Sequence, residues 1–143
     1  MLSNSAKYAI KAVMYLALKS SADQKIMVKD IAKPINVPRH YIAKILQDLS
    51  KKHLISSTKG PKGGFYISKE NQNTSIYDII ITVDGHERIN SCLLSLKNCN
   101  SSNPCAIHHL AYPEKENILT HFKNSTIQKL AEEVKMGKSV LPL

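Results

Sequence analysis

The sequence contains no apolar run long enough to cross a bilayer. Its longest, Ala12–Leu18, has seven residues, whereas a membrane-spanning helix needs about 20. It also lacks a nucleophile motif, a phosphate-binding loop and paired carboxylates for acid–base chemistry, so we do not expect an enzyme. Apolar residues are nevertheless plentiful, because 43% of the chain is hydrophobic and 22% is charged. This balance excludes a disordered, collagen-like or low-complexity chain, and 143 residues suit one domain or a small domain with a helical appendage.

A secretory leader is also missing. Lys7 and Lys11 flank an apolar stretch near the N-terminus, but Lys11 interrupts it and Leu18–Ser21 make a poor cleavage site. We therefore expect a cytoplasmic protein. In such a reducing compartment, an odd number of cysteines, here three, argues against a disulfide framework and favours a metal or redox site.

Acidic residues are scarce in the first half of the chain. Residues 1–75 hold 13 Lys and Arg against 4 Asp and Glu, a net charge of +9, whereas residues 76–143 hold 7 of each. This asymmetry favours binding to a polyanion, most often nucleic acid. The alternative is a basic face that only maintains solubility. A membrane surface is less favoured, because the cations are spread over several elements rather than one amphipathic helix.

Two helices and a turn are predicted at the start of this basic half. Apolar residues surround most of a helix predicted over residues 4–20, so we expect it to be largely buried. A short strand is predicted over 26–28 and a second helix over 30–35. Pro34 should end that helix, since it lacks an N–H group and clashes with the preceding turn. Asn36 suits a left-handed turn position.

A third helix is predicted over residues 38–53, with Pro38 in its first turn. Its apolar residues recur at helical spacing on one face, and the opposite face is polar and basic. Two helices joined by a short turn, the second with a basic outer face, are typical of a helix-turn-helix. The apolar face comprises Ile42, Ile45, Leu46 and Leu49, and the basic face comprises His40, Lys44, Gln47 and Lys51.

A β-hairpin is predicted after the third helix. Strands over 54–59 and 64–68 enclose the glycine-rich tip Gly60–Gly64. Taken alone, this could be an ordinary hairpin whose glycines are needed only for the backbone angles of the turn. Because it follows a helix-turn-helix, we interpret the hairpin as a wing. Its tip can approach a phosphate backbone closely, and Lys59 and Lys62 can reach phosphates or the minor groove.

The second half is predicted to be helical around an irregular segment. We expect helices over 74–83, 113–123 and 126–133, with irregular structure over 84–105. Pro113 fits the first turn of its helix and would kink a helix that began earlier. The apolar residues of this half are too many for one short helix pair to bury, which favours a symmetric dimer.

The cysteines lie together in one short segment. Cys92, Cys99 and Cys105 are separated by six and five residues, and His108 follows the third after two more. Thiolates are ligands for zinc, copper or iron–sulfur clusters. Structural zinc sites usually show pairs two to four residues apart, which are absent here, so wider loops favour a cluster. The alternative is three unrelated cysteines in a surface loop.

Together these features resemble a family, the bacterial winged-helix regulators typified by IscR and NsrR, which sense iron–sulfur status, nitric oxide or redox state. The match extends over essentially the whole chain. The wing and the cysteine triad together make it specific, whereas neither alone would. The matching segments are Lys7–Ala9, Asp30–Ala32, Tyr41–Leu49, the wing Lys59–Phe65 and the three cysteines.

The resemblance implies a two-iron or four-iron cluster held by Cys92, Cys99 and Cys105. A residue other than cysteine completes such a site. In the IscR type it is a histidine just after the third cysteine, which is His108 here. In the NsrR type it is an aspartate in the first helix of the partner subunit. Lys7 occupies that position in this sequence, which weakens the nitric-oxide interpretation.

We therefore expect a dimeric transcriptional regulator that binds a palindromic operator in double-stranded DNA. The expected fold is mainly α with a small β-hairpin wing (α+β), with a winged helix-turn-helix over residues 1–75. Residues 76–143 are expected to form a sensor loop and a helical dimerisation region. The alternatives are a regulator whose cysteines form a thiol switch or zinc site and, least favoured, an iron–sulfur electron carrier. Candidate DNA contacts are Arg39, His40, Lys44, Gln47, Lys51, Lys59 and Lys62.

Overall fold

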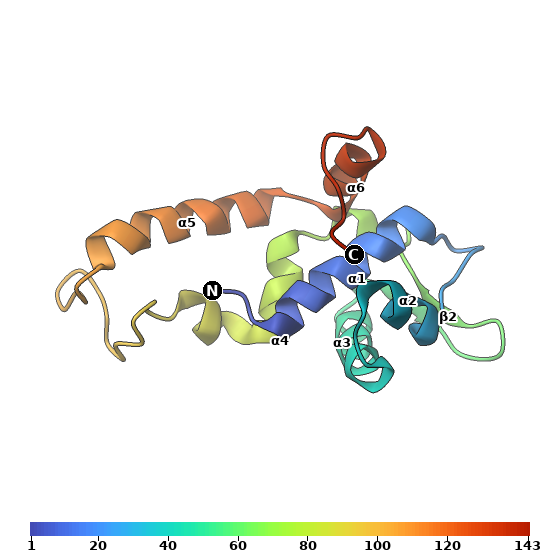
Figure 1. The fold of residues 1–143 in the computed structure, drawn as a ribbon, viewed down its shortest axis with the longest axis horizontal. Helices are drawn as coiled ribbons and strands as arrows, with labels where there is room; N and C mark the ends of the chain where they lie inside the picture. Colours follow the sequence, from blue (N-terminus) through green and yellow to red (C-terminus); the bar gives the residue numbers. More distant parts are fainter.

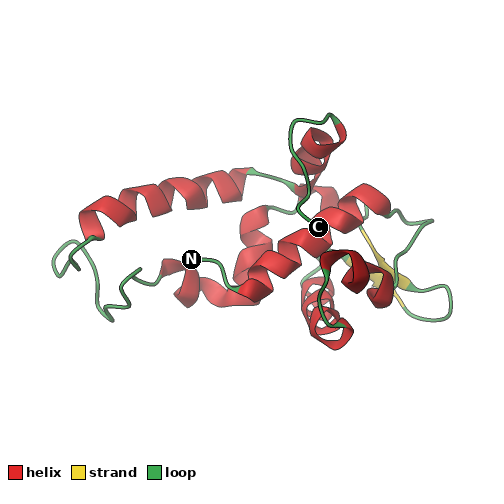
Figure 2. Cartoon of the chain, viewed as in Figure 1, coloured by secondary structure: helices red, strands yellow, loops and turns green.

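Helices dominate the fold. The computed structural model describes residues 1–143 and contains one two-stranded antiparallel hairpin (Figures 1 and 2), which confirms the expected α+β class. Helix α1 runs through the middle of the molecule, and α5 extends outward as an arm with the cysteine segment at its far end (Figure 1). The elements are α1 (Asn4–Lys19), α2 (Val28–Ile35), α3 (Arg39–Lys51), β1 (Ser56–Thr58), β2 (Gly64–Tyr66), a 3₁₀ turn (Asn71–Asn73), α4 (Ile76–Asn90), α5 (His108–Asn124) and α6 (Ile127–Lys135).

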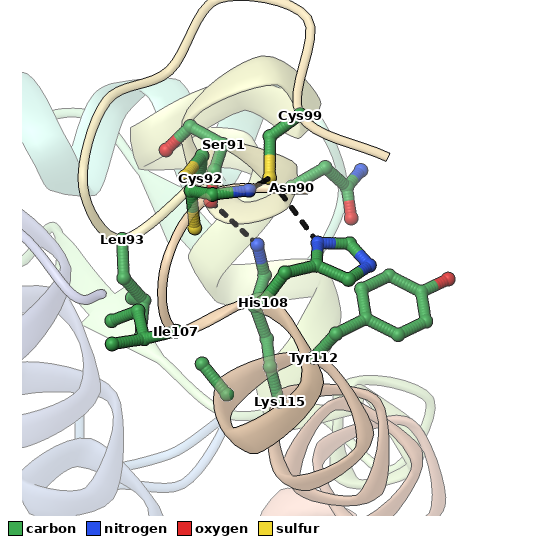
Figure 3. A pocket seen from close by; sticks show the side chains of 11 residues that line it. Asn90, Ser91, Cys92, Leu93, Cys99, Ile107, His108, Tyr112 and Lys115 are labelled. Carbon is green, nitrogen blue, oxygen red and sulfur yellow. Dashed lines mark hydrogen bonds between the residues drawn. The ribbon is translucent and has the colours of Figure 1, made fainter. Parts of the chain in front are cut away.

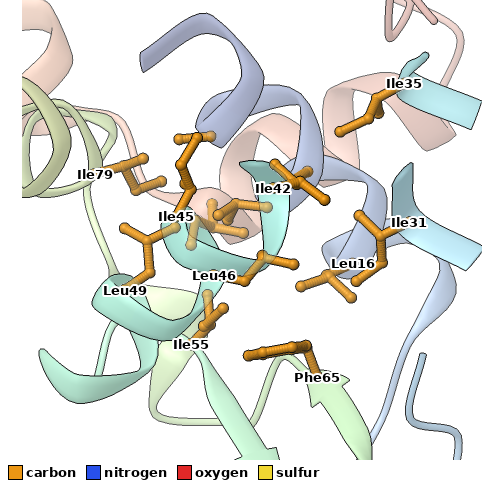
Figure 4. Packing of buried hydrophobic residues seen from close by; sticks show 14 of the residues in the cluster. Leu16, Ile31, Ile35, Ile42, Ile45, Leu46, Leu49, Ile55, Phe65 and Ile79 are labelled. Carbon is orange, nitrogen blue, oxygen red and sulfur yellow. The ribbon is translucent and has the colours of Figure 1, made fainter. Parts of the chain in front are cut away.

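One hydrophobic core joins α1 to the helix-turn-helix, the base of the wing and α4 (Figure 4). Its 21 buried residues come from both halves of the chain. The apolar face predicted for α3 is buried throughout, and each such side chain contributes roughly 1.5–3 kcal/mol when fully buried. The core residues labelled in Figure 4 are Leu16, Ile31, Ile35, Ile42, Ile45, Leu46, Leu49, Ile55, Phe65 and Ile79.

The turn between α2 and α3 has the predicted conformation. Asn36 is left-handed, with φ 53° and ψ 54°. Helix α2 ends at Ile35, one residue after Pro34, as the proline predicts. The turn therefore sets the angle at which α3 leaves α2, and both helices bury their apolar faces against α1.

The strand predicted over residues 26–28 is wrong. Only Ile26 pairs, through two backbone hydrogen bonds of 2.8 and 2.9 Å with Phe65, and α2 already begins at Val28. The same two bonds hold the base of the wing against the segment that precedes α2. The wing strands are also shorter than predicted, because the pairing extends only from Ser56 opposite Tyr66 to Thr58 opposite Gly64.

Gly64→Ala is expected to destabilise the wing. An added Cβ would lie 2.7 Å from the carbonyl oxygen of Ile26, and the φ of +148° is unfavourable for an alanine. We expect the free energy of unfolding to fall by roughly 1–3 kcal/mol, measured by urea denaturation. Gly60→Ala is the matched control, because Gly60 also has a positive φ but has no atom within 4 Å of an added Cβ. An equal fall in the free energy of unfolding in both variants would contradict a role for the close approach of Gly64 to Ile26.

Two helices of the second half are longer than predicted. Helix α4 consists of two helical segments that meet at a kink at Gly85, whose φ of 77° and ψ of 159° are not helical. The second segment extends to Asn90, through residues predicted to be irregular. The start predicted at residue 113 is also wrong, since α5 begins at His108 and contains Pro113. The proline is exposed, so its ring needs no place in the core, and it removes only one helical hydrogen bond.

Helix α5 leaves apolar side chains in solvent. Only Lys115 and Leu119 of this helix are buried, whereas Leu110 is 77% and Ile118 41% exposed on the opposite side. A stripe of exposed apolar residues of this kind marks a face that lacks a partner. None of the helices combines the length and the apolar character needed to cross a membrane.

Candidate DNA-binding surface and cysteine site

The residues predicted to contact DNA are all exposed on α3 and the wing. Lys44 is held by Asp48 one turn along α3, at 2.9 Å. An exposed pair of this kind is worth roughly 0.2–1 kcal/mol, so the ammonium can exchange it for a phosphate at little cost. The exposed set comprises Arg39, His40, Lys44, Gln47, Lys51, Lys59 and Lys62.

Sequence reasoning missed cations on α2. Lys29 and Lys33 line a shallow hollow together with Arg39, at the junction of α2 and α3. Their spacing of four residues places them on the same helical face, and this spacing could have revealed them in the sequence. A third missed cation, Lys25, lies over the ring of Tyr66 in the wing, 5.5 Å from its centroid. The basic surface therefore extends beyond α3 onto α2 and the wing base.

The four predicted ligands come together where α4, the loop and α5 meet, and Figure 3 labels Cys92, Cys99 and His108 there. The three sulfur atoms lie within 4.8 Å of one another. Cys92 follows the end of α4, and its Sγ lies 3.5 Å from the Sγ of Cys105. His108 is the first residue of α5, and its Nδ1 lies 3.2 Å from the Sγ of Cys99.

A tight turn of polar residues brings Cys99 and Cys105 together. The side-chain oxygen of Asn100 accepts hydrogen bonds from the backbone N–H groups of Ser102 and Asn103, both at 2.8 Å. This local bonding replaces regular secondary structure, which asparagine and serine favour in turns. The turn allows the Cys105 N–H group to donate to the Cys99 sulfur at 3.4 Å. The polar residues between the cysteines therefore shape the site.

The thiols differ in acidity. Burial raises the pKa of Cys92, but hydrogen bonds from the backbone N–H groups of Leu96 and Leu94 lower it. Bonds with the other two thiols lower it further, so that the pKa falls from 9.0 to about 7. At Cys99, the backbone N–H group of Cys105 lowers the pKa, while burial and the neighbouring thiols raise it more, so the net pKa is raised. Cys92 therefore ionises more readily than Cys99.

In the metal-free protein, Cys92 is expected to be alkylated before Cys99 at neutral pH. The thiolate is the nucleophile, and a pKa of about 7 leaves roughly half of Cys92 ionised at that pH. An ordinary thiol of pKa 9.0 is ionised to roughly one part in a hundred there. The labelling rate of Cys92 should rise with pH through a midpoint at about 7, as measured by iodoacetamide labelling and peptide mass spectrometry. Equal labelling of Cys99 at neutral pH would contradict this difference.

The donor set fits a metal or an iron–sulfur group. Donor atoms on one tetrahedral metal lie roughly 3.5–4 Å apart, given metal–donor bonds of about 2.0–2.3 Å. Cys92 with Cys105, and Cys99 with His108, form two pairs at close to this spacing. The three sulfur atoms, all within 4.8 Å of one another, are compatible with a metal ion or an iron–sulfur group, and His108 lies beside one of them.

Two side chains of α5 hold parts of the cysteine site in place. The ring of Tyr112 stacks on that of His108, with centroids 5.2 Å apart and an interplanar angle of 14°. Further along α5, the ammonium of Lys115 donates to the carbonyl oxygen of Ser91, next to Cys92, at 2.6 Å. His108 is thus oriented by its own helix, and the start of the cysteine loop is tied to that helix.

Fold and site together define a winged helix-turn-helix regulator with a cysteine-rich site. Residues 2–133 match the Rrf2 family, described as "Iron-dependent Transcriptional regulator", and the chain belongs to this family. The chain is 38% identical over 130 residues to an HTH-type transcriptional regulator of Aquifex aeolicus, covering 90% of this chain and 89% of the relative. Identity to IscR of Yersinia pseudotuberculosis is 26% over 129 residues, covering 90% and 77% of the two chains.

The structure is also similar to a solved member of the IscR group. The T. potens IscR structure superposes with a TM-score of 0.72 and 20% identity, covering 98% of this chain and 92% of that one. This likeness confirms the winged-helix fold. The resemblance to IscR-type regulators is confirmed as well, and so is the expectation of a transcriptional regulator rather than an enzyme, since the family and its relatives carry that description.

Proposed function

We propose that the chain is a dimeric, cytoplasmic transcriptional regulator whose affinity for double-stranded DNA depends on an iron–sulfur cluster. One observation carries the proposal: three thiols and an imidazole converge on the same chain as a basic winged helix-turn-helix. The family description, which names iron, supports the choice of metal. Residues 1–75 then serve DNA binding, and residues 76–143 serve sensing and dimerisation.

In this proposal α3 enters the major groove and the wing lies along the backbone or minor groove. The helix-turn-helix places its second helix against base edges, while the preceding helix crosses the backbone. Lys29 and Lys33 on α2 are then backbone contacts, with Lys59 and Lys62 as their counterparts on the wing. The residues on α3 that read or flank the bases are Arg39, His40, Lys44, Gln47 and Lys51.

The cluster ligands are Cys92, Cys99, Cys105 and His108. The three cysteines act as thiolates, and the imidazole of His108 is the fourth donor. When bound, a cluster supplies one-electron redox chemistry and sensitivity to oxidants. The donor set is compatible with either a two-iron or a four-iron core. Lys7, in place of an acidic ligand, is exposed on α1 and carries the wrong charge to bind a metal.

Side-chain contacts join α4 to the start of α1, and the start of α1 to α3. Asp84, on α4 near its kink, has a side chain only 3% exposed and accepts hydrogen bonds from the N–H and hydroxyl groups of Ser3, the cap of α1. Near the start of α1, the hydroxyl of Ser5 bonds to that of Tyr41 on α3, and the ring of Tyr8 packs edge-on against Tyr41 at 6.0 Å. A shift of α4 on cluster loss is therefore transmitted through α1 to the recognition helix.

The exposed apolar stripe of α5 supports a homodimer. Leu110 and Ile118 leave large side chains in solvent on a helix whose inner face alone meets the core. A second copy of α5 would cover them by two-fold symmetry, and a symmetric dimer matches a palindromic operator. Dimer formation would place two α3 helices on one face of the DNA. The distance between these two helices would then determine the affinity for the operator.

The test begins with protein purified without oxygen. Iron, sulfide and zinc are counted per chain and the visible absorption is recorded, and operator sequences are selected from genomic DNA with loaded and metal-free protein. We expect matched iron and sulfide, and a specific site whose affinity changes by roughly 5- to 150-fold on cluster loss, the usual range of allosteric coupling. No specific site with either form would contradict the regulator, and iron-free protein from cells with intact cluster assembly would contradict the cluster.

A second candidate is a regulator that uses zinc or a thiol switch at the same site. The Sγ atoms of Cys92 and Cys105 lie 3.5 Å apart, close enough for small loop movements to bring them to the 2.05 Å or so of a disulfide. This candidate predicts one zinc per chain, or colourless protein whose DNA affinity responds to peroxide and recovers with dithiothreitol. The metal count separates it from the cluster.

A further inference from the structure

Lys115 is a buried cation without an acidic partner. The residue is 8% exposed, its ammonium donates to one acceptor, the carbonyl oxygen of Ser91, and neither ion pair of the structure includes it. Burying a lysine charge is costly unless an anion compensates it, and a single carbonyl dipole does so only in part. A negative charge close to the Lys115 ammonium would therefore lower the cost of burying it.

The cysteine site can supply that charge. Lys115 lines the same cleft as Cys92, Cys99 and Cys105. In Figure 3 its side chain rises from α5 beside His108, and the ammonium lies at the start of the cysteine loop. Three thiolates carry three negative charges, and a divalent ion or an oxidised cluster core with two positive charges leaves one of them uncompensated. The single positive charge of Lys115 balances it.

We propose that Lys115 is a positioning and charge-balancing residue of the cysteine site. It favours the loaded, anionic state, and through Ser91 it holds the first turn of the loop against α5. This inference rests on the proposed metal-binding function. It distinguishes Lys115 from a structural lysine, since its contribution depends on loading: the buried charge has no acidic partner in the metal-free protein and is balanced once the site is filled.

Lys115→Met tests the inference, because methionine keeps an unbranched apolar stem and removes the charge. Metal-free protein is titrated with Co²⁺ alone, followed by the thiolate–cobalt absorption, and its melting temperature is measured separately. We expect Co²⁺ affinity to fall roughly tenfold, which is about 1.4 kcal/mol. The metal-free melting temperature should be unchanged or higher. Ser91 is exposed, so water can take the place of the ammonium at its carbonyl.

Two further variants complete the test. Lys115→Arg keeps the charge and should retain most of the Co²⁺ affinity. Lys97→Met removes the same charge from an exposed position in the cysteine loop, where solvent screens it, and should leave the affinity near that of the wild type. Equal weakening by Lys115→Met and Lys97→Met would overturn the inference. A lower metal-free melting temperature with unchanged Co²⁺ affinity would also overturn it, because that pattern belongs to a structural lysine. Wild-type protein without a thiolate–cobalt band would overturn the metal site itself, and Lys115's role with it.

Discussion

Replacing Cys92, Cys99 or Cys105 with serine is expected to abolish the bound cluster. Each residue supplies one of only three thiolates, and a serine oxygen is a much poorer ligand for iron in such clusters. The three side chains lie outside the hydrophobic core, so the fold should persist. Iron and sulfide per chain should fall to near zero in each variant, while circular dichroism and the metal-free melting temperature stay close to those of the wild type. A single serine variant with full iron and sulfide would remove that cysteine from the ligand set.

His108 and His109 form a matched pair for the fourth ligand. The two rings are neighbours, 5.6 Å apart and perpendicular, but only His108 lies against the Cys99 sulfur, and His109 is exposed. His108→Ala should weaken cluster retention by at least the 10–100-fold that loss of a supporting outer residue typically costs. His109→Ala should leave retention unchanged. The rate at which visible absorption decays in the presence of a chelator measures both, and equal decay rates would exclude His108 as a ligand.

Loss of the proposed cluster should also change the affinity for DNA. The serine variants should bind the operator as the metal-free wild type does, because neither carries a cluster. Ser5→Ala removes the hydroxyl contact between α1 and Tyr41 without touching the cysteine site. It should therefore reduce the difference in affinity between loaded and metal-free protein while leaving the iron content unchanged. An unaltered difference would exclude this route of coupling.

The double variant Lys59→Ala, Lys62→Ala is expected to bind DNA far more weakly than the wild type at physiological salt. Both ammonium groups are exposed at the tip and edge of the wing. Removing one phosphate contact should reduce the slope of log affinity against log salt by about 0.9, so removing two reduces it by about 1.8. The weakening should be similar for operator and random DNA, since phosphate contacts carry no base information. Fluorescence anisotropy at several salt concentrations measures the slope.

Lys135→Ala, Lys138→Ala is the matched control for the wing. These two lysines are equally exposed but lie at and just after the end of α6, away from α3 and β2. Their removal subtracts the same net charge, so it reports the effect of charge alone. An equal change in salt slope for both double variants would mean that the wing makes no direct contact with the DNA.

The helix-turn-helix could be predicted from the sequence because its signals are local. The apolar spacing of Ile42, Ile45, Leu46 and Leu49 specifies which face of α3 is buried, and Asn36 specifies a left-handed turn. The glycine-rich tip likewise predicts the hairpin. The strand at Ile26 was mispredicted because its single bridge depends on Phe65, a partner 39 residues away.

The end of α4 and the start of α5 were predicted wrongly for a related reason. Pro113 suggests the first turn of a helix, yet α5 begins earlier, at His108, and helical structure resumes after the non-helical Gly85 as far as Asn90. A glycine with an open environment can kink a helix at modest cost, and an exposed proline in an outward-facing helix needs no place in the core. Whether such a residue ends a helix depends on what surrounds it in space.

By itself, the sequence determined the class of this protein and the chemical identity of its candidate site: a basic winged helix-turn-helix followed by three cysteines and a histidine. Residue type, spacing and charge suffice for this, because side-chain periodicity and metal affinity are local properties. Only the tertiary structure decided that Cys92 pairs with Cys105 and Cys99 with His108, and that Lys115 lies buried beside them. It also joined Asp84 on α4 to Ser3 at the start of α1. Such contacts depend on how helices far apart in the chain pack together, and packing is set by the whole core.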